Sequence, residues 1–497
     1  MGKFDRRIRL GATFQAAWWA AGVSAAAGIS APACAQQVLV DKEGARLALE
    51  PYGAATQLGS RAELAAQQGP LDASLAAALE RGGGRLNLGD TPAGMVQIPS
   101  SWRSENVRFQ ARWALSSDAE LNLTAENGAR RAYNAASLVG SADDGQLTRD
   151  QTRSAQIRAI ARLDRVEAQV GAENATSAFR TQSGGANADS TRNWLTSRRL
   201  FGKLAWRATD RVSLEAGQAV QDFTVGWRGA ETITSSDAYL TPNAAVVLKP
   251  WRRTTWRFDA EQTLTPIEPN QFAAYAQLAT PGAGAAPQPD RGWRYGAWVE
   301  QDLGGGARLT AGVSDWRLES VTELGPVGAG EAPVGIGPGG RQQLDVNLTT
   351  PLAPVGLPGT TLAGELTLRR SHVQDPFTGE RRAFSGESPY RAQLRLSGAL
   401  PATDLNWSVV AQADGPQTLS QMNQVTNLGP TAGLGGAVSY GAGPLTVSLE
   451  LENLVGGSRE VTTYSYAGSR AADAALADVI RRNDESRAVR ISLKRAM

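Results

Sequence analysis

The sequence predicts an all-β chain, a transmembrane antiparallel outer-membrane β-barrel of about 18 strands (roughly 16–22). Three observations lead there. Apolar and polar residues alternate with a period of two after residue 106, as in strands with one apolar face. Short turns alternate with long polar or Gly-rich connections. After the N-terminal region, no stretch approaches the roughly 18 apolar residues of a membrane helix. A secreted β-solenoid or sandwich is the weaker alternative.

Composition excludes several function classes. The 497 residues include 50 Lys and Arg, 48 Asp and Glu, one His and one Cys. This balance argues against a nucleic-acid partner, which would demand a basic excess. Single Cys and His residues exclude a disulfide scaffold and a Cys- or His-based metal site, so no cofactor is expected. With His372 as the sole imidazole and no Ser motif beside it, an enzyme is not expected.

The N-terminus has the layout of a cleavable secretory signal over residues 1–35. Basic residues between Lys3 and Arg9 precede an Ala-rich apolar stretch, and Ala33-Cys34-Ala35 provides a small-x-small cleavage site. A membrane anchor and a lipoprotein acceptor at Cys34 are the weaker alternatives, and Arg6-Arg7 leaves the twin-arginine route open. We therefore expect export to the outer membrane, with its lipid and the barrel-assembly machinery as partners.

The first two hairpins can be paired residue by residue. Residues 107–115 and 119–126 fold about Ser117, which pairs Trp113 with Leu121 on one face and Arg108 with Glu126 on the other. Residues 155–163 and 166–173 fold about Asp164-Arg165 and pair Arg162 with Glu167. Both faces agree in each hairpin, which is what a correct antiparallel register requires.

Six more hairpins follow, and the last strand covers residues 489–493. Their turns are expected near residues 209–211, 250, 304–306, 351–359, 399–403 and 441–443. The long loops between hairpins are expected at 127–154, 174–197, 223–238, 264–292, 317–340, 371–388, 414–432 and 454–486. One closing strand is expected from residues 59–100. The predicted domains are thus the signal, an N-terminal segment 36–100 (plug remnant or linker plus first strand) and the barrel 101–497.

Charged residues in phase with the inner face are the candidate lumen lining. They either select polar or anionic solutes or form a ladder that neutralises itself, and the ladder is the favoured interpretation. The candidates are Arg108, Arg112, Glu120, Glu126, Arg158, Arg162, Glu167, Lys203, Arg207, Arg257 and Asp259, with Glu215 and Glu261 in the same phase. On the outer face, Trp206, Trp251, Trp256 and Trp407 near short turns are expected to form an aromatic girdle.

Two segments resemble TonB-dependent receptors of the alphaproteobacterial outer-membrane type. The first consists of residues 357–359 and 371–390, which include Ser371-His372-Val373-Gln374-Asp375-Pro376-Phe377-Thr378-Gly379 and Gly386, and the second, at the end of the sequence, consists of residues 447–454 and 487–495. The resemblance covers residues 106–497 and implies that His372, Asp375, Pro376, Gly379 and Gly386 belong to an extracellular loop. Such receptors carry a complete plug domain inside 22 strands, whereas residues 36–105 show no convincing plug motif.

The resemblance implies uptake or passage of a small solute across the outer membrane, by a barrel that lacks a full plug. Val38-Leu39-Val40-Asp41 faintly resembles the segment of such receptors that pairs with TonB, so TonB is a weakly supported candidate partner. The alternatives are a non-transporting surface or scaffold protein that binds a partner through its long loops, and a truncated, inactive receptor. The sequence does not name the solute.

Overall fold

The computed structural model describes residues 45–50, 53–68, 70–91, 94–134, 146–183, 190–228, 232–265, 289–327, 330–400, 403–455, 458–470, 475–484 and 487–495. The predicted signal over residues 1–35 and the segment 38–41 lie outside these ranges. No described helix is long and apolar enough to cross a membrane.

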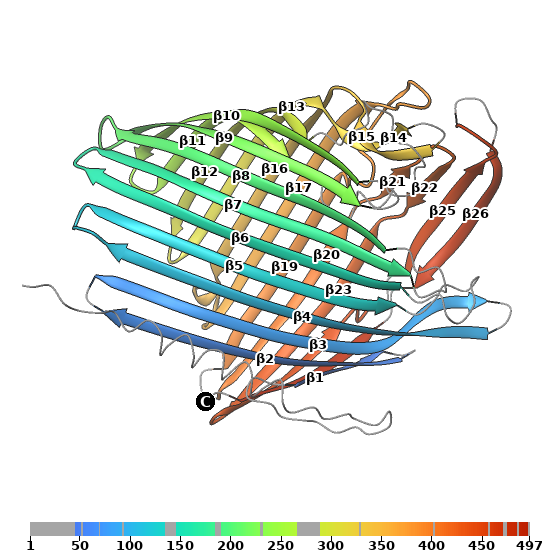
Figure 1. The fold of residues 1–497 in the computed structure, drawn as a ribbon. Coiled ribbons are helices and arrows are strands. Elements are labelled where there is room, and N and C mark those ends of the chain that lie inside the picture. The colour runs from blue at the N-terminus through green and yellow to red at the C-terminus, as the bar shows by residue number, and fades with distance from the viewer. Residues whose placement is uncertain are drawn as a thin grey trace, which may run out of the picture. The chain divides into compact units, whose positions relative to one another are not determined.

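Within the described residues, twenty strands form one closed antiparallel ring (Figure 1). They are β1 (Ala45–Glu50), β2 (Gly53–Gln68), β3 (Leu71–Thr91), β4 (Gly94–Ala114), β5 (Ala119–Asn134), β6 (Gln146–Leu163), β7 (Val166–Ser183), β8 (Ser190–Arg207), β9 (Val212–Arg228), β10 (Thr232–Trp251), β11 (Thr254–Thr265), β12 (Asp290–Gly304), β13 (Ala307–Ser320), β16 (Gly339–Pro351), β17 (Thr360–Gln374), β19 (Tyr390–Leu400), β20 (Leu405–Asp414), β23 (Thr431–Ala442), β24 (Leu445–Glu452) and β27 (Ala488–Arg495). Each strand pairs with its neighbour in chain order, and β27 pairs with β1, as in Ala48 opposite Arg490. This last pairing closes the sheet and leaves no open edge.

The remaining strands lie in the longer connections. The hairpin β14 (Thr322–Val327) and β15 (Gly330–Gly335) connects β13 to β16, and β18 (Arg381–Arg382) pairs antiparallel with the end of β17. A separate four-stranded sheet consists of β21 (Gln417–Ser420), β22 (Gln424–Leu428), β25 (Ser458–Tyr466) and β26 (Ala475–Asp484). We call the barrel end that carries these elements the loop end. The opposite end, which we call the short-turn end, contains a 3-10 helix, Ala353–Val355, between β16 and β17.

The eight predicted hairpins are confirmed. Trp113 lies opposite Leu121 and Arg108 opposite Glu126, and Arg162 lies opposite Glu167 across the turn at residues 164–165. The left-handed backbone of Asp164 (φ 44°) suits that two-residue turn. The period-two pattern therefore predicted the pairing of all eight hairpins and the register of the first two correctly.

Residues 45–100 contribute more of the wall than the single strand expected there. They form β1, β2, β3 and the beginning of β4, so the ring has twenty strands, within the predicted range but above the central value. The described part of the segment 36–100 thus lies in the barrel wall.

Several of the predicted long loops contain long strand segments, including those at 127–154 and 174–197. β6 and β7 each have 18 residues, whereas about 9–11 suffice to cross a membrane. Their outer halves lack apolar alternation because a strand that extends beyond the bilayer has no lipid face. The predicted loop segments that remain at residues 135–145, 184–189, 229–231 and 266–288 lie outside the described residues.

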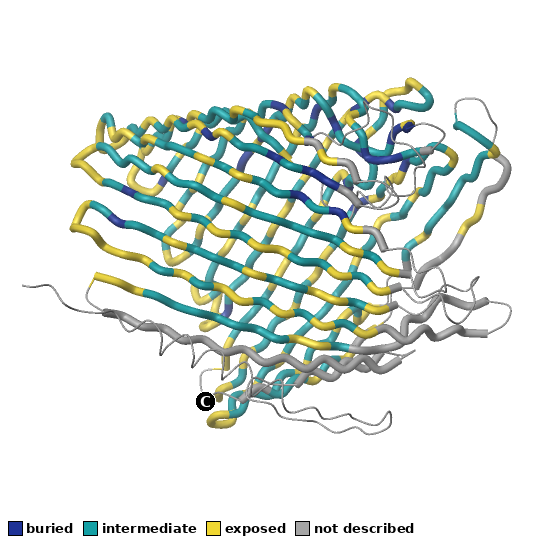
Figure 2. Tube along the Cα trace, viewed as in Figure 1, coloured by how far each residue is buried: buried dark blue, intermediate teal, exposed yellow. Residues whose placement is uncertain are grey.

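The two faces of the wall differ in chemistry. One face carries exposed large apolar side chains such as Val170, Leu200 and Val220, and the other carries the paired charges described below. In a bilayer the apolar face must be the outer one. Trp206, Trp251 and Trp256 lie exposed near the short-turn end, while Trp407 is partly buried beside Gly398. Buried residues are few along the wall and gather toward the loop end (Figure 2).

Candidate functional site in the barrel interior

All eleven predicted lumen-lining residues share the inner face. The register places Arg108 of β4 opposite Glu126 of β5. Asn122 of β5 lies opposite Arg112 of β4 on one side and opposite Arg158 of β6 on the other. The same phase continues through Arg162 and Glu167 to Lys203 and Arg207, and then through Glu215 to Arg257 and Asp259. Since adjacent strands place directly opposed residues on the same face, this phase defines one continuous inner surface.

The first group of inner charges spans β4 to β7. Arg112 contacts Glu120 at 2.6 Å, and Arg162 contacts both Glu120 (3.6 Å) and Glu167 (3.2 Å). Arg108 and Glu126 pair separately at 3.3 Å. The Glu120 side chain is only 10% exposed, so its two cations compensate for much of its lost hydration.

The second group spans β8 to β12. Glu215 bridges Lys203 (2.8 Å) and Arg257 (3.0 Å), and Arg257 also approaches Asp259 at 3.8 Å. Arg294 then contacts Asp259 (2.6 Å) and Glu261 (2.8 Å). Sequence reasoning missed Arg294, although its strand alternates and its register partner is Glu261. The observed pairing favours the neutralising ladder for most of these charges.

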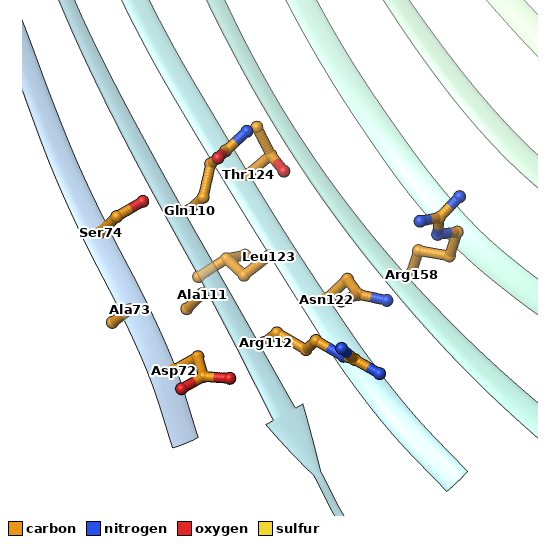
Figure 3. A pocket seen from close by; sticks show the side chains of 10 residues that line it. All are labelled: Asp72, Ala73, Ser74, Gln110, Ala111, Arg112, Asn122, Leu123, Thr124 and Arg158. Atoms are coloured by element: carbon orange, nitrogen blue, oxygen red, sulfur yellow. The ribbon is translucent and has the colours of Figure 1, made fainter. Parts of the chain in front are cut away.

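Arg158 and Arg207 differ from the other predicted residues because neither has an ion pair in the described part of the chain. The Nε of Arg158 is also buried without a hydrogen-bond partner there. Arg158 borders a hollow of about 590 Å³ whose polar lining includes Asp72, Ser74, Gln110, Arg112, Asn122 and Thr124 (Figure 3). These side chains offer both hydrogen-bond donors and acceptors, and the unpaired guanidinium adds a site for an anionic group.

The substitution Glu215→Gln should destabilise the barrel because it leaves Lys203 and Arg257 facing each other without their shared anion. Those two side chains are 37% and 40% exposed, so the pair is neither fully exposed nor fully buried. We therefore expect the free energy of unfolding to fall by about 1–2 kcal/mol, a value between those of exposed and buried ion pairs. Denaturant unfolding in detergent measures it. Glu173→Gln removes the same charge at an inner position that has no ion pair with any described residue, and it should leave the midpoint unchanged. Equal midpoints for both variants would contradict the bridging role.

The β14–β15 hairpin folds inward from the rim. Its Val327 and Ala332 pack in one cluster with Leu195, Phe223 and Val225 of β8 and β9. These wall residues are in phase with the inner charges, because Leu195 shares a face with Lys203, and Phe223 with Glu215. The hairpin is rooted between β13 and β16, so it reaches across part of the interior at the loop end. The sequence predicted only a long loop at residues 317–340 for this segment.

Asp375 organises the connections beside that hairpin. Its Oδ2 accepts hydrogen bonds from Arg382 Nε (2.6 Å) and Arg470 Nη2 (2.7 Å), and its Oδ1 accepts the N–H groups of Phe377 and Thr378. The Asp375 side chain is 1% exposed. Burial alone would raise its pKa, but these hydrogen bonds outweigh it and lower the pKa to about 2.

The same network ties three connections together. Arg382 also pairs with Glu323 of β14 at 2.8 Å, and Glu331 of β15 accepts the N–H of Met422 at 2.6 Å. Arg470, which follows β25, reaches Asp375 from the four-stranded sheet. We call this assembly of hairpin, β17–β19 connection and four-stranded sheet the cap.

The other predicted loop residues have different positions. His372 lies within β17 opposite Gly340, not in the loop, because the strand continues to Gln374. Pro376 begins a turn that Gly379 ends, with φ 74° and its N–H donated to the Asp375 carbonyl. Gly386 has φ 75°, a conformation that favours glycine, and donates to the Thr418 carbonyl of β21. Among the described residues no cluster of acidic, His and Cys side chains could hold a metal ion.

Several solved structures similar to this chain are receptors for siderophores or ferric chelates, although no family model and no curated protein matches its sequence. The siderophore receptor PiuA of Acinetobacter baumannii has a TM-score of 0.67 and 10% identity over 91% of this chain and 76% of its own. The ferric-catecholate import receptor Fiu of Escherichia coli K12 gives 0.64 and 9% over 93% and 82%. The ferric yersiniabactin uptake receptor FyuA of Yersinia pestis gives 0.61 and 13% over 93% and 80%. The chain therefore has the β-barrel fold of these receptors.

Proposed function

We propose that the protein lies in the outer membrane and conducts or takes up a small polar or anionic solute through its interior. The observation that carries the proposal is the closed ring, in which β27 pairs with β1 around a polar inner face. The short-turn end would face the periplasm and the loop end the exterior, as in outer-membrane barrels generally. Outer-membrane lipid and the barrel-assembly machinery are its expected partners.

The similar solved structures support a transport role. PiuA, Fiu and FyuA are described as receptors for siderophores or for ferric chelates. In this chain the hollow beside Arg158 supplies the features that a polar anion would use, namely an unpaired guanidinium and neighbouring amide and hydroxyl groups. TonB is a candidate partner through residues 38–41, which lie outside the described part.

Liposome swelling tests this function. Liposomes that contain the purified protein are diluted into isotonic solutions of small sugars, amino acids or dicarboxylates, and entry of the solute causes swelling. We expect swelling with at least one polar class and faster entry of anionic than of cationic solutes of equal size. The variant Arg158→Gln should reduce the preference for anions. Folded protein, verified by a changed gel migration after boiling, that admits no solute would contradict passive passage.

A second candidate function, a surface protein that binds a partner through its loops, is favoured by the cap. The Asp375 network holds that assembly in one arrangement, which suits a recognition surface. Swelling separates the two candidates, because a recognition scaffold needs no solute passage.

A further inference from the structure

A row of arginines crosses the barrel wall near the loop end. The register places Arg81, Arg103, Arg131, Arg149, Arg180 and Arg192 directly opposite one another on successive strands from β3 to β8. Arg228 continues the row on β9. With about 4.8 Å between strands, the row is roughly 29 Å long. We call it the arginine row.

The row lies on the outer face. Arg103 is in phase with Val107 and Trp113, and Arg192 with Leu200, all of which are exposed apolar side chains. The side chains of the six arginines from β3 to β8 are all exposed. This face is therefore opposite to the one that carries the charge pairs of the interior.

The row lies toward the loop end of the main apolar surface, with the partly buried Trp194 between it and Leu200, and with exposed Tyr133 and Leu147 just beyond it on the same face. On β8 Arg192 lies eight positions from Leu200, and on β6 Arg149 lies eight positions from Ile157. Leu200 and Ile157 are the exposed large apolar residues of the outer face that lie nearest to the arginine on the side of the apolar band. On β4 Arg103 lies four positions beyond Val107. Because barrel strands are tilted, the row rises obliquely from the edge of the apolar band into the zone of lipid headgroups.

These charges are not balanced by the protein. Arg103 pairs with Glu105 at 2.8 Å, whereas the other five described side chains have no ion pair. Glu105 is also the single acidic residue on the two outer rows that flank the arginines in the described strands. Like charges directly opposite each other destabilise a sheet, so an external anion that neutralised the row would stabilise it.

We infer that the arginine row binds the phosphorylated glycolipid headgroups of the outer leaflet. A guanidinium binds phosphate bidentately, and several in line fit a surface that carries many phosphates better than one soluble anion. The inference rests on the proposed outer-membrane location but not on transport. A binding measurement on purified protein can therefore fail or succeed independently of solute passage.

The test titrates the detergent-purified protein with bis-phosphorylated lipid A and counts bound molecules by native mass spectrometry. The variant R131Q/R149Q/R180Q/R192Q should bind more than about tenfold more weakly, since each basic residue near an anionic surface adds to affinity. The control R165Q/R211Q/R252Q/R253Q removes equal charge from exposed turns at the opposite end and should bind as the unaltered protein does. Added salt should weaken binding of the unaltered protein.

Three outcomes would overturn the inference. They are unchanged binding by the arginine-row variant, an equal loss in the control, and equal binding of the same glycolipid without phosphates. Binding of soluble polyphosphate in preference to the glycolipid would overturn it as well. Altered gel migration after boiling verifies that each variant is folded, and we expect it to be retained because the substitutions remove repulsion.

Discussion

Shortening the β14–β15 hairpin should raise single-channel conductance in a planar bilayer severalfold. The variant replaces residues 325–332 with Gly-Gly, which joins Leu324 to Pro333, a pair that already lies opposite in the hairpin. It removes Val327 and Ala332, the side chains that pack on the inner wall at β8 and β9, and keeps Glu323 for its contact with Arg382. Ions would then pass through the part of the interior that the hairpin now fills.

The matched control shortens an exposed turn at the other end. Replacement of residues 353–356 with Gly-Gly removes the 3-10 helix, whose residues contact no inner wall cluster. This control should conduct like the unaltered protein. If both variants conduct alike, the hairpin does not restrict the interior and the inward packing has no functional consequence.

Replacing Asp375 with Ala should detach the cap while leaving the barrel folded. Arg470, whose side chain is 8% exposed, would keep its charge without its buried partner, whereas Arg382, which is 17% exposed, would retain its pair with Glu323. Loss of one partner from a buried pair costs about 3–5 kcal/mol. This cost exceeds the free energy that we expect to hold a connection outside the bilayer in its folded arrangement. Limited proteolysis of intact proteoliposomes should then cleave between β17 and β19 or near Arg470.

Acid should have the same effect on the unaltered protein. The folded pKa of Asp375, about 2, lies below its ordinary value of 3.8, so the carboxylate stabilises the cap fully above pH 4 and loses this effect as the pH falls toward 2. An acid-stable protease should reveal increasing cleavage over that window. Glu380→Ala alters a nearby exposed carboxylate and should not change cleavage at neutral pH. Resistance of Asp375→Ala equal to that of this control would refute the role of the network.

The hairpins could be predicted because the side-chain pairs on both faces of each hairpin had to fit the same register. Trp113 opposite Leu121 and Arg112 opposite Asn122 satisfy the same register, and a shift by one residue would violate both. The segment from Leu71 to Leu79 offers no such test. Its odd positions are all apolar, but Ala76 and Ala78 place apolar residues on the other face as well, so the alternation is weak even though the segment pairs with β4 along its whole length. That weak alternation explains the lower predicted strand number.

The cap could not be predicted from local patterns. Asp375 and Arg470 are 95 positions apart, and their contact depends on how the four-stranded sheet is placed on the rim. The inner charges are a mixed case. Arg162 and Glu167 follow from a two-residue turn, whereas Arg294 reaches Glu261 only after a long connection that gives no register. The arginine row needed the full set of strand pairings before its continuity was visible.

Cysteine accessibility at two adjacent positions of β7 tests the central claim, that this wall separates lipid from a hydrated interior. Gln169 lies in the inner phase, with its amide donated to Glu167, and Val170 is 60% exposed on the apolar face. Single cysteines are placed at each position in a protein whose one natural cysteine, Cys34, is replaced by Ser. In proteoliposomes a charged, water-soluble thiol reagent should label position 169 and spare position 170, while a lipid-soluble maleimide should label 170. Equal labelling of both positions by the charged reagent would contradict a membrane barrel with an aqueous interior.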